Sequence, residues 1–174
     1  QRVEDALKRL ARQTLIQKNG EIYVFLTNEE QEINKAIDGF FVDPSDVIGT
    51  AAELVFDGLY PEKKYRYAAF NGRYQLGFNQ MMDDRPYKVN QNYDITLRIL
   101  TPDSDDAADE ATLRMIPGQS RCVLVVLPND GSFLDELRSA IKIEKYLKSE
   151  SSSSATQFEQ IKAAKRIEAR DRRE

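Results

Sequence analysis

Two adjacent carboxylates, Asp83 and Asp84, could take part in chemistry, because paired carboxylates can hold a divalent cation or act as an acid and a base. Arg85 follows them directly, and Pro86 and Tyr87 complete the segment. The guanidinium can instead form a local ion pair with the carboxylates, which would make the segment a rigid loop. Three interpretations stay open at this stage: a structural loop, an interface with a partner formed by Asp83, Asp84, Arg85 and Tyr87, or the metal site of an enzyme.

A second acidic run extends from Asp103 to Glu110. It lacks the D-x-[DN]-x-[DN]-G spacing of a calcium-binding loop, so we expect a solvated loop between two strands. The single cysteine, Cys122, lies in the apolar run CVLVVL, where a cysteine usually serves as a small buried hydrophobe. It has no second cysteine with which to form a disulfide within the chain.

Two absences in the composition exclude common classes of enzyme. The chain has no histidine, which excludes a Ser/His/Asp triad, a histidine general base and a histidine metal ligand. The sequence also lacks the G-x-x-x-x-G-K-[ST] motif of a P-loop, and its eight glycines are scattered rather than gathered in a phosphate-binding turn. We therefore expect no catalytic residue, no cofactor-binding residue and no metal ligand within this chain.

Four cations near the N-terminus are candidates for contact with double-stranded DNA. Apolar residues repeat with helical spacing over residues 3–11, and Lys8, Arg9 and Arg12 fall on the opposite face. Lys18 stands beside an Asn-Gly pair that predicts a tight hairpin. A helix followed by such a hairpin resembles the second half of a winged helix, in which the helix enters the major groove and the hairpin touches the backbone. The alternative is that these cations are ordinary solvated charges on a protein-contact module.

The middle of the chain predicts an α+β fold. A T-x-x-E capping box at residues 27–30 starts one helix, and Asp43-Pro44 starts the next. An Asn-Gly pair at residues 71–72 predicts a second hairpin. Later strands are expected at YDITLRIL, ATLRMI and RCVLVVL, and the last is apolar on both faces, which is typical of the most buried strand. We expect a mainly antiparallel sheet with flanking helices.

The C-terminal part predicts a helix, a linker and an arm. Ser132 with Asp135 is expected to cap a helix, and four consecutive serines at residues 151–154 predict a flexible linker. The apolar stripe beyond the serines is narrow, which favours a charged helical arm over a core helix. The predicted segments are a winged-helix-like half with a linking helix at residues 1–42, an α+β domain at 43–148, a serine-rich linker at 149–154 and a helical arm at 155–174.

The two ends of the chain carry no start or stop signals. The first residue is Gln1 rather than Met, and the last helical pattern has no glycine or proline stop, so we expect a piece of a longer protein. No apolar run approaches the roughly 18–20 residues that cross a bilayer, and the N-terminus lacks the apolar centre of a signal peptide. The sequence thus predicts a cytoplasmic protein without a membrane partner.

Three stretches resemble a known family: GEIYVFLTNEEQEINKAI, then YRYAAFNGRYQLGFNQMMDDRPYKVNQNYDITLRILTP, then ATLRMIPGQSRCVLVVLP together with FLDELRSAIKIEKYLK. In this combined order they are similar to the middle of the BrxC family, the large P-loop proteins of bacterial BREX phage-defence systems. The resemblance covers nearly the whole chain apart from the serine run and the tail, and it includes no catalytic fingerprint.

The resemblance implies a multidomain ATPase parent that binds ATP and Mg²⁺ outside this chain, blocks phage replication and supports host DNA methylation. It also implies other BREX proteins as partners, and homo-oligomer formation through the parent. Together with the missing catalytic groups, it predicts a non-catalytic regulatory or scaffolding segment that contacts DNA or partner subunits. The alternative function is a sequence-specific winged-helix DNA-binding regulator.

Overall fold

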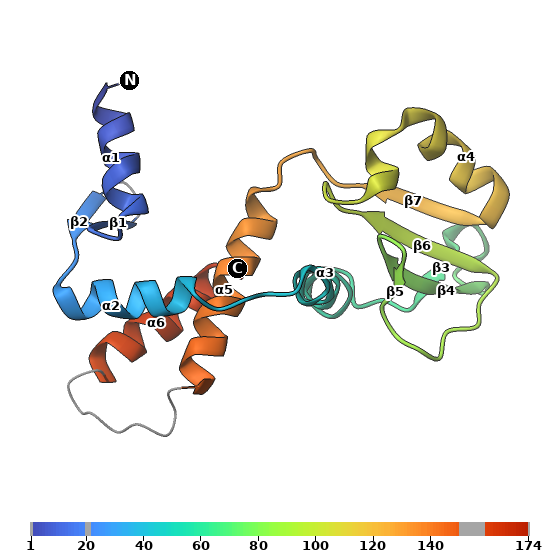
Figure 1. Cartoon of the computed structure of the whole chain (residues 1–174). Helices are drawn as coiled ribbons and strands as arrows, with labels where there is room; N and C mark the ends of the chain where they lie inside the picture. The colour runs from blue at the N-terminus through green and yellow to red at the C-terminus, as the bar shows by residue number, and fades with distance from the viewer. Residues whose placement is uncertain (1, 20–21, 150–158, 174) are drawn as a thin grey trace. The chain divides into compact units, whose positions relative to one another are not determined.

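The computed structural model describes residues 2–19, 22–149 and 159–173, so the predicted serine linker lies outside the described residues. The chain forms two compact units (Figure 1). Unit 1 consists of residues 1–42 and 138–174, and unit 2 of residues 43–137. Helix α5 (Ser132–Ser149) begins in unit 2 and continues into unit 1.

Unit 1 begins with a helix and a hairpin, as the sequence predicts. Helix α1 (Arg2–Arg12) is followed by strands β1 (Ile16–Asn19) and β2 (Ile22–Phe25), which pair in antiparallel register from Ile16 opposite Phe25 to Asn19 opposite Ile22. These two strands form a separate two-stranded sheet. A helix and a two-stranded hairpin are too few elements to define a winged helix, and the predicted winged-helix-like element is not confirmed.

Helix α2 (Asn28–Asp38) starts at the predicted capping box. The Glu30 amide donates to Thr27 Oγ1 at 3.3 Å, and the Thr27 amide donates to a Glu30 carboxylate oxygen at 2.8 Å. Two backbone donors that the helix itself cannot satisfy are thereby paired, which fixes the first turn.

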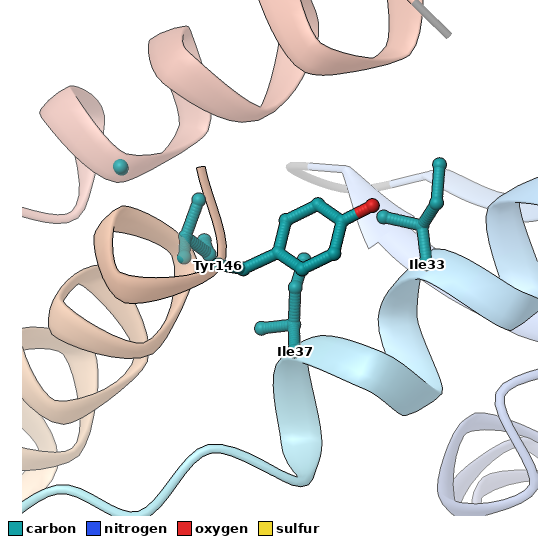
Figure 2. Packing of buried hydrophobic residues seen from close by; sticks show 5 residues of the cluster. Ile33, Ile37 and Tyr146 are labelled. Carbon is teal, nitrogen blue, oxygen red and sulfur yellow. The ribbon is translucent and has the colours of Figure 1, made fainter. Parts of the chain in front are cut away.

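Helices α2, α5 and α6 (Glu159–Asp171) form the core of unit 1. Figure 2 shows Tyr146 of α5 directed towards Ile33 and Ile37 of α2. The whole buried cluster consists of Ile33, Ile37, Ile143, Tyr146 and Ala169. On the rim, Lys142 Nζ donates to the Asp38 carbonyl at 2.9 Å.

Helix α6 is the predicted charged arm, yet it contributes Ala169 and the partly buried Ile161 to this cluster. The prediction underestimated the packed face because that face also includes Lys162 and Lys165, which are both buried. A lysine can bury its aliphatic stem while its ammonium reaches a polar partner, as Lys165 Nζ does at 2.7 Å from Glu168. A count of apolar residues alone therefore misses such a face.

Unit 2 starts with helix α3 (Pro44–Glu53), whose first turn is capped by Asp43 as predicted, since the Ser45 amide donates to Asp43 Oδ1 at 2.8 Å. The chain continues through the π-helical turn η1 (Leu54–Leu59), strand β3 (Lys64–Arg66), the 3₁₀ turn η2 (Ala68–Phe70), strands β4 (Gln75–Met82), β5 (Arg85–Pro86) and β6 (Ile95–Leu100), the 3₁₀ turn η3 (Asp105–Ala108), helix α4 (Glu110–Ser120) and strand β7 (Cys122–Val126). Helix α5 begins at Ser132, where the sequence predicted a helix start, and the Ser132 amide donates to Asp130 Oδ1 at 3.0 Å. This hydrogen bond lowers the pKa of Asp130.

The sheet of unit 2 is mixed, and the prediction of a mainly antiparallel sheet was wrong. Its order is β3-β4-β6-β7, with β5 pairing with β4. Strands β4, β6 and β7 are parallel, whereas β3 and β5 run antiparallel to β4. Parallel neighbours need a long crossover, and α4 supplies it between β6 and β7 (Figure 1).

The segment ATLRMI, predicted as a strand, lies within α4. Leu113 and Met115 alternate with polar residues over too short a stretch to separate the two periods. The Asp109 carboxylate marks the true helix start, because it accepts from the amides of Ala111 at 3.1 Å and Thr112 at 3.3 Å.

Strand β7 was predicted to be the most buried strand, and it is not. It ends the sheet order, and Val123 and Val125 are 55% and 40% exposed. Cys122 at its start is buried, as predicted, and burial raises the pKa of its thiol. An apolar run shows that a strand can be buried on both faces, but not that the fold places another layer over it.

Candidate functional site

The predicted segment around Asp83 forms the tight turn between β4 and β5, since Met82 pairs with Arg85. Asp83 has a φ of 53°, a left-handed conformation that aspartate tolerates better than most residues. Its buried carboxylate accepts from the Thr101 amide at 2.7 Å through Oδ1 and from Thr101 Oγ1 at 3.0 Å through Oδ2. Asp83 therefore ties the end of β4 to the residue that follows β6.

The guanidinium that reaches Asp83 belongs to Arg98 of β6, which donates to the Asp83 carbonyl oxygen. Arg98 also forms an ion pair with Asp106 at 2.7 Å. The sequence predicted that Arg85 would pair locally, but Asp84 and Arg85 are both exposed at the turn. Asp106 belongs to the acidic run that was expected to be solvated, so part of this run holds the sheet.

The residues that follow this turn form a fixed loop, residues 87–94, which we call the anchored loop. At its start, the Tyr87 hydroxyl donates to Asp57 Oδ2 at 2.6 Å, and Lys88 Nζ lies 3.0 Å from Asp57 Oδ1. The Tyr87 ring packs 5.3 Å from the ring of buried Phe56. Phe56 and Asp57 both lie in η1, and π-helical turns of this kind are often found at functional sites.

These contacts change the acidity of both partners. The hydrogen bonds from Tyr87 and Lys88 lower the pKa of Asp57, because they stabilise its charged form. Burial and the hydrogen bond to Asp57 raise the pKa of Tyr87 to about 12, because they favour the neutral phenol. At neutral pH the pair is therefore a neutral donor on an ionised acceptor, which is a strong type of hydrogen bond.

The Tyr87→Phe variant should reveal a pH-dependent contribution of this hydrogen bond to stability. The pKa of Tyr87 is about 12 in the fold, against about 10 in an unfolded chain. The contribution is therefore fully present below about pH 10 and is lost as the pH rises through about 12. For Asp57 the pKa is lowered, so the contribution is present above the unfolded pKa and is lost as the pH falls through the folded one. Thermal unfolding should show a difference between wild type and Tyr87→Phe that is constant near neutral pH and smaller at both extremes; a difference independent of pH would contradict this.

The middle of the anchored loop is held by Gln91, whose side chain takes the place of a neighbouring strand. Its Oε1 accepts from the Gln80 amide, and its Nε2 donates to the Gln80 carbonyl at 3.0 Å and to the Lys88 carbonyl at 2.8 Å. An amide side chain has one acceptor and one donor group, as a strand residue has, so it can satisfy both backbone groups of Gln80.

The end of the anchored loop is held by Asn79 and Gly77 of β4. Asn79 Nδ2 donates to the Tyr93 carbonyl at 2.8 Å, and the Tyr93 amide donates to Asn79 Oδ1 at 3.0 Å. The Tyr93 ring lies against Gly77, where a Cβ atom would overlap the ring. The loop is thus fixed at its start, middle and end, while Val89 between these anchors is 95% exposed.

Several polar side chains of this arrangement hold backbone in place, since those of Asn79, Asp83 and Gln91 all bond to backbone groups. Among the described ranges, which omit residues 1, 20–21, 150–158 and 174, no group of three or more Cys, Asp or Glu residues is arranged to hold a metal. Sequence reasoning found Tyr87 but missed Asp57, Asn79 and Gln91, which belong to no motif. Gly77 was the one available signal, since a glycine inside a strand often marks a close approach of another group.

The four N-terminal cations are exposed, with Lys8, Arg9 and Arg12 on α1 and Lys18 on β1. Arg9 Nε lies 3.4 Å from the Asp5 carbonyl oxygen. Contact of these four residues with DNA stays a prediction, and so does an interface formed by Asp83, Asp84, Arg85 and Tyr87.

Fold and site together define unit 2 as a mixed α/β domain that presents a fixed surface loop. A family model described as the BREX ATP-binding protein BrxC 4th domain with six-stranded beta sheet matches residues 40–174. The chain belongs to this family and is a component of a BREX defence protein, as the resemblance in sequence indicated. No solved structure is significantly similar to the chain. Across the described part of the chain, no helix combines the length and the apolar character needed to span a membrane.

Proposed function

We propose that this chain is a non-catalytic scaffolding module that binds another BREX protein through the anchored loop. The observation that supports this is the exposed Val89 between three sets of hydrogen bonds that hold the start, middle and end of the loop. A loop that is already fixed loses little conformational entropy when a partner binds, so most of the contact energy contributes to affinity. The fully buried core of an interface is more apolar than its rim, and Val89 could contribute to such a core.

The ATP binding named in the family description belongs, in this proposal, to a different part of the BrxC polypeptide. The sequence of this chain contains no P-loop motif, and its glycines are scattered. ATP and Mg²⁺ would be bound elsewhere in the cytoplasmic parent protein, while this module supplies a contact surface. A regulatory role follows if partner binding alters the parent ATPase.

The Val89→Arg variant tests the loop. We expect its affinity for the BREX partner to fall by about tenfold or more, because a charge replaces a buried apolar contact. The stability of the chain should change by less than about 0.5 kcal/mol, because the side chain is exposed. Binding can be measured by titrating the wild-type and variant chains against each of the other purified BREX proteins.

Met115→Arg is the matched control, because Met115 is also an exposed apolar residue of unit 2 but lies on α4. It should bind the partner as the wild type does. Equal affinities of all three chains for every BREX protein would show that the anchored loop is not the contact surface.

A further inference from the structure

The hairpin formed by β3 and β4 has an exposed surface that the proposed function does not use. Strand β3 ends the sheet order, and residues 61–69 and 73–76 are all exposed. Only the later part of β4, from Phe78 onward, pairs with β6. The first part of the hairpin therefore extends beyond the rest of the sheet.

The strand register places three tyrosines and a leucine on one face of this hairpin. Tyr65 pairs with Leu76, and the Tyr67 amide donates to the Tyr74 carbonyl at 3.0 Å, which continues the same register. Directly opposed residues share a face, and so do residues two apart on one strand. Their exposures lie between 44% for Tyr67 and 56% for Tyr74, so the rings are accessible rather than part of the core.

Cations are concentrated in the hairpin that carries this tyrosine face, and the register places Lys64 and Arg66, which alternate with Tyr65 and Tyr67, on its opposite face. Lys63, Lys64, Arg66 and Arg73 lie in and beside the hairpin, against the single carboxylate Glu62. Lysine and arginine on an edge strand also prevent strands of different molecules from pairing. This protection by itself would explain Lys64 and Arg66. It does not explain three exposed tyrosines, because edge protection requires charge and not aromatic surface.

We propose that the tyrosine face of the β3–β4 hairpin binds single-stranded nucleic acid. Aromatic rings on an exposed sheet stack with unpaired bases, and a cation on the same side, such as Lys63 two residues before Tyr65, contacts a phosphate. Tyr65 and Tyr67 are two residues apart on one strand and therefore about 7 Å apart, which allows each ring to meet a different base. Charge complementarity favours a polyanion over a protein partner, since cations outnumber carboxylates in this segment. This surface is distinct from the anchored loop and from the N-terminal cations.

Fluorescence anisotropy with labelled oligo-dT and oligo-U tests the proposal on the purified chain at low salt. We expect binding of one or both, with single-stranded DNA and RNA distinguished by the two probes. The double change Tyr65→Ala and Tyr67→Ala should weaken binding by on the order of a hundredfold, since each stacked base contributes roughly tenfold. Tyr65→Phe with Tyr67→Phe keeps both rings and should bind nearly as the wild type. Lys63→Gln should reduce the slope of log K against log salt by about 0.7, whereas Arg66→Gln on the opposite face should change it less.

Three controls isolate the surface. Tyr23→Ala removes an exposed tyrosine from the other hairpin, in unit 1, and should leave oligonucleotide binding unchanged. Combined replacement of Lys8, Arg9 and Arg12 by alanine should also leave it unchanged, which separates this surface from the winged-helix prediction. Val89→Arg should bind oligonucleotide normally, so that failure of the scaffolding proposal and failure of this one give different results.

Lack of binding at low salt would overturn the proposal, and so would binding that survives the double alanine change in a chain with normal circular dichroism. Loss of binding to a BREX protein in the alanine variant, without any oligonucleotide binding by the wild type, would instead identify a protein-contact surface.

Discussion

Replacement of Phe56 by alanine is expected to lower the free energy of unfolding by about 3–5 kcal/mol. The Phe56 side chain is 1% exposed in the π-helical turn η1, and its ring packs against Tyr87. Alanine would remove nearly the whole side chain from this packed site, and the fixed backbone around it could close the cavity only in part. Urea denaturation of the wild-type and variant chains, followed by circular dichroism, would measure the difference.

Phe56→Leu is the control for this experiment, because leucine keeps most of the apolar volume. It should cost roughly 1–1.5 kcal/mol, in the range of volume-conserving core changes. If Phe56→Ala were no more destabilising than Phe56→Leu, the ring would not be packed as described, and the start of the anchored loop would lack its apolar support.

Replacement of Asp83 by alanine should lower the free energy of unfolding by about 3 kcal/mol. The change removes both acceptors of Thr101, a residue that is 0% exposed, and leaves its amide and hydroxyl without partners. Alanine at a φ of 53° adds strain of roughly 1–2 kcal/mol, since its Cβ is crowded in the left-handed region. The same denaturation measurement would report the loss.

Two variants separate the causes of this effect. Asp83→Asn should cost less than about 1.5 kcal/mol, because its amide oxygen can accept from the Thr101 amide, its NH₂ can donate to Thr101 Oγ1, and asparagine tolerates the left-handed backbone. Asp84→Ala changes the exposed neighbour in the same turn and should lie within about 0.5 kcal/mol of wild type. Similar losses for Asp83→Ala and Asp84→Ala would contradict the assigned role of Asp83.

Helix starts and tight turns could be predicted from the sequence because neighbouring residues determine them. The capping pair Thr27 and Glu30 and the helix start at Asp43 are present as expected. At the second hairpin, Asn71 and Gly72 have φ values of 52° and 69°, the left-handed region that this residue pair predicts.

Sheet topology could not be predicted in the same way, because it depends on contacts between distant segments. The helix at Glu110–Ser120 is short, and its apolar residues also fit a strand. Because this segment was predicted as a strand, the sequence predicted antiparallel neighbours where the chain makes a parallel crossover. The exposed valines of β7 show the same limit, since apolar character does not specify which element lies over a strand.

The candidate site was predictable only in the segment that contains Tyr87. Its partner Asp57 lies 30 residues earlier in the chain, and Asn79 precedes Tyr93 by 14 residues. No local pattern connects such pairs, since each one forms only after the strands have aligned. The three-dimensional contacts show that the segment around Asp83, for which a metal site was one prediction, is held in place by hydrogen bonds with neighbouring residues.

The Gln91 side chain has a consequence for how copies of the domain meet one another. On the edge of β4 that faces away from β6, β3 covers residues 75–77 and β5 covers residues 81–82, so the backbone of Gln80 lies in an interval between two short strands. Gln91 and the Tyr87 amide occupy that interval. An uncovered stretch there would offer a template for strand addition by a second molecule. The Gln91 side chain and the Tyr87 amide thus leave no backbone group of Gln80 open to such pairing.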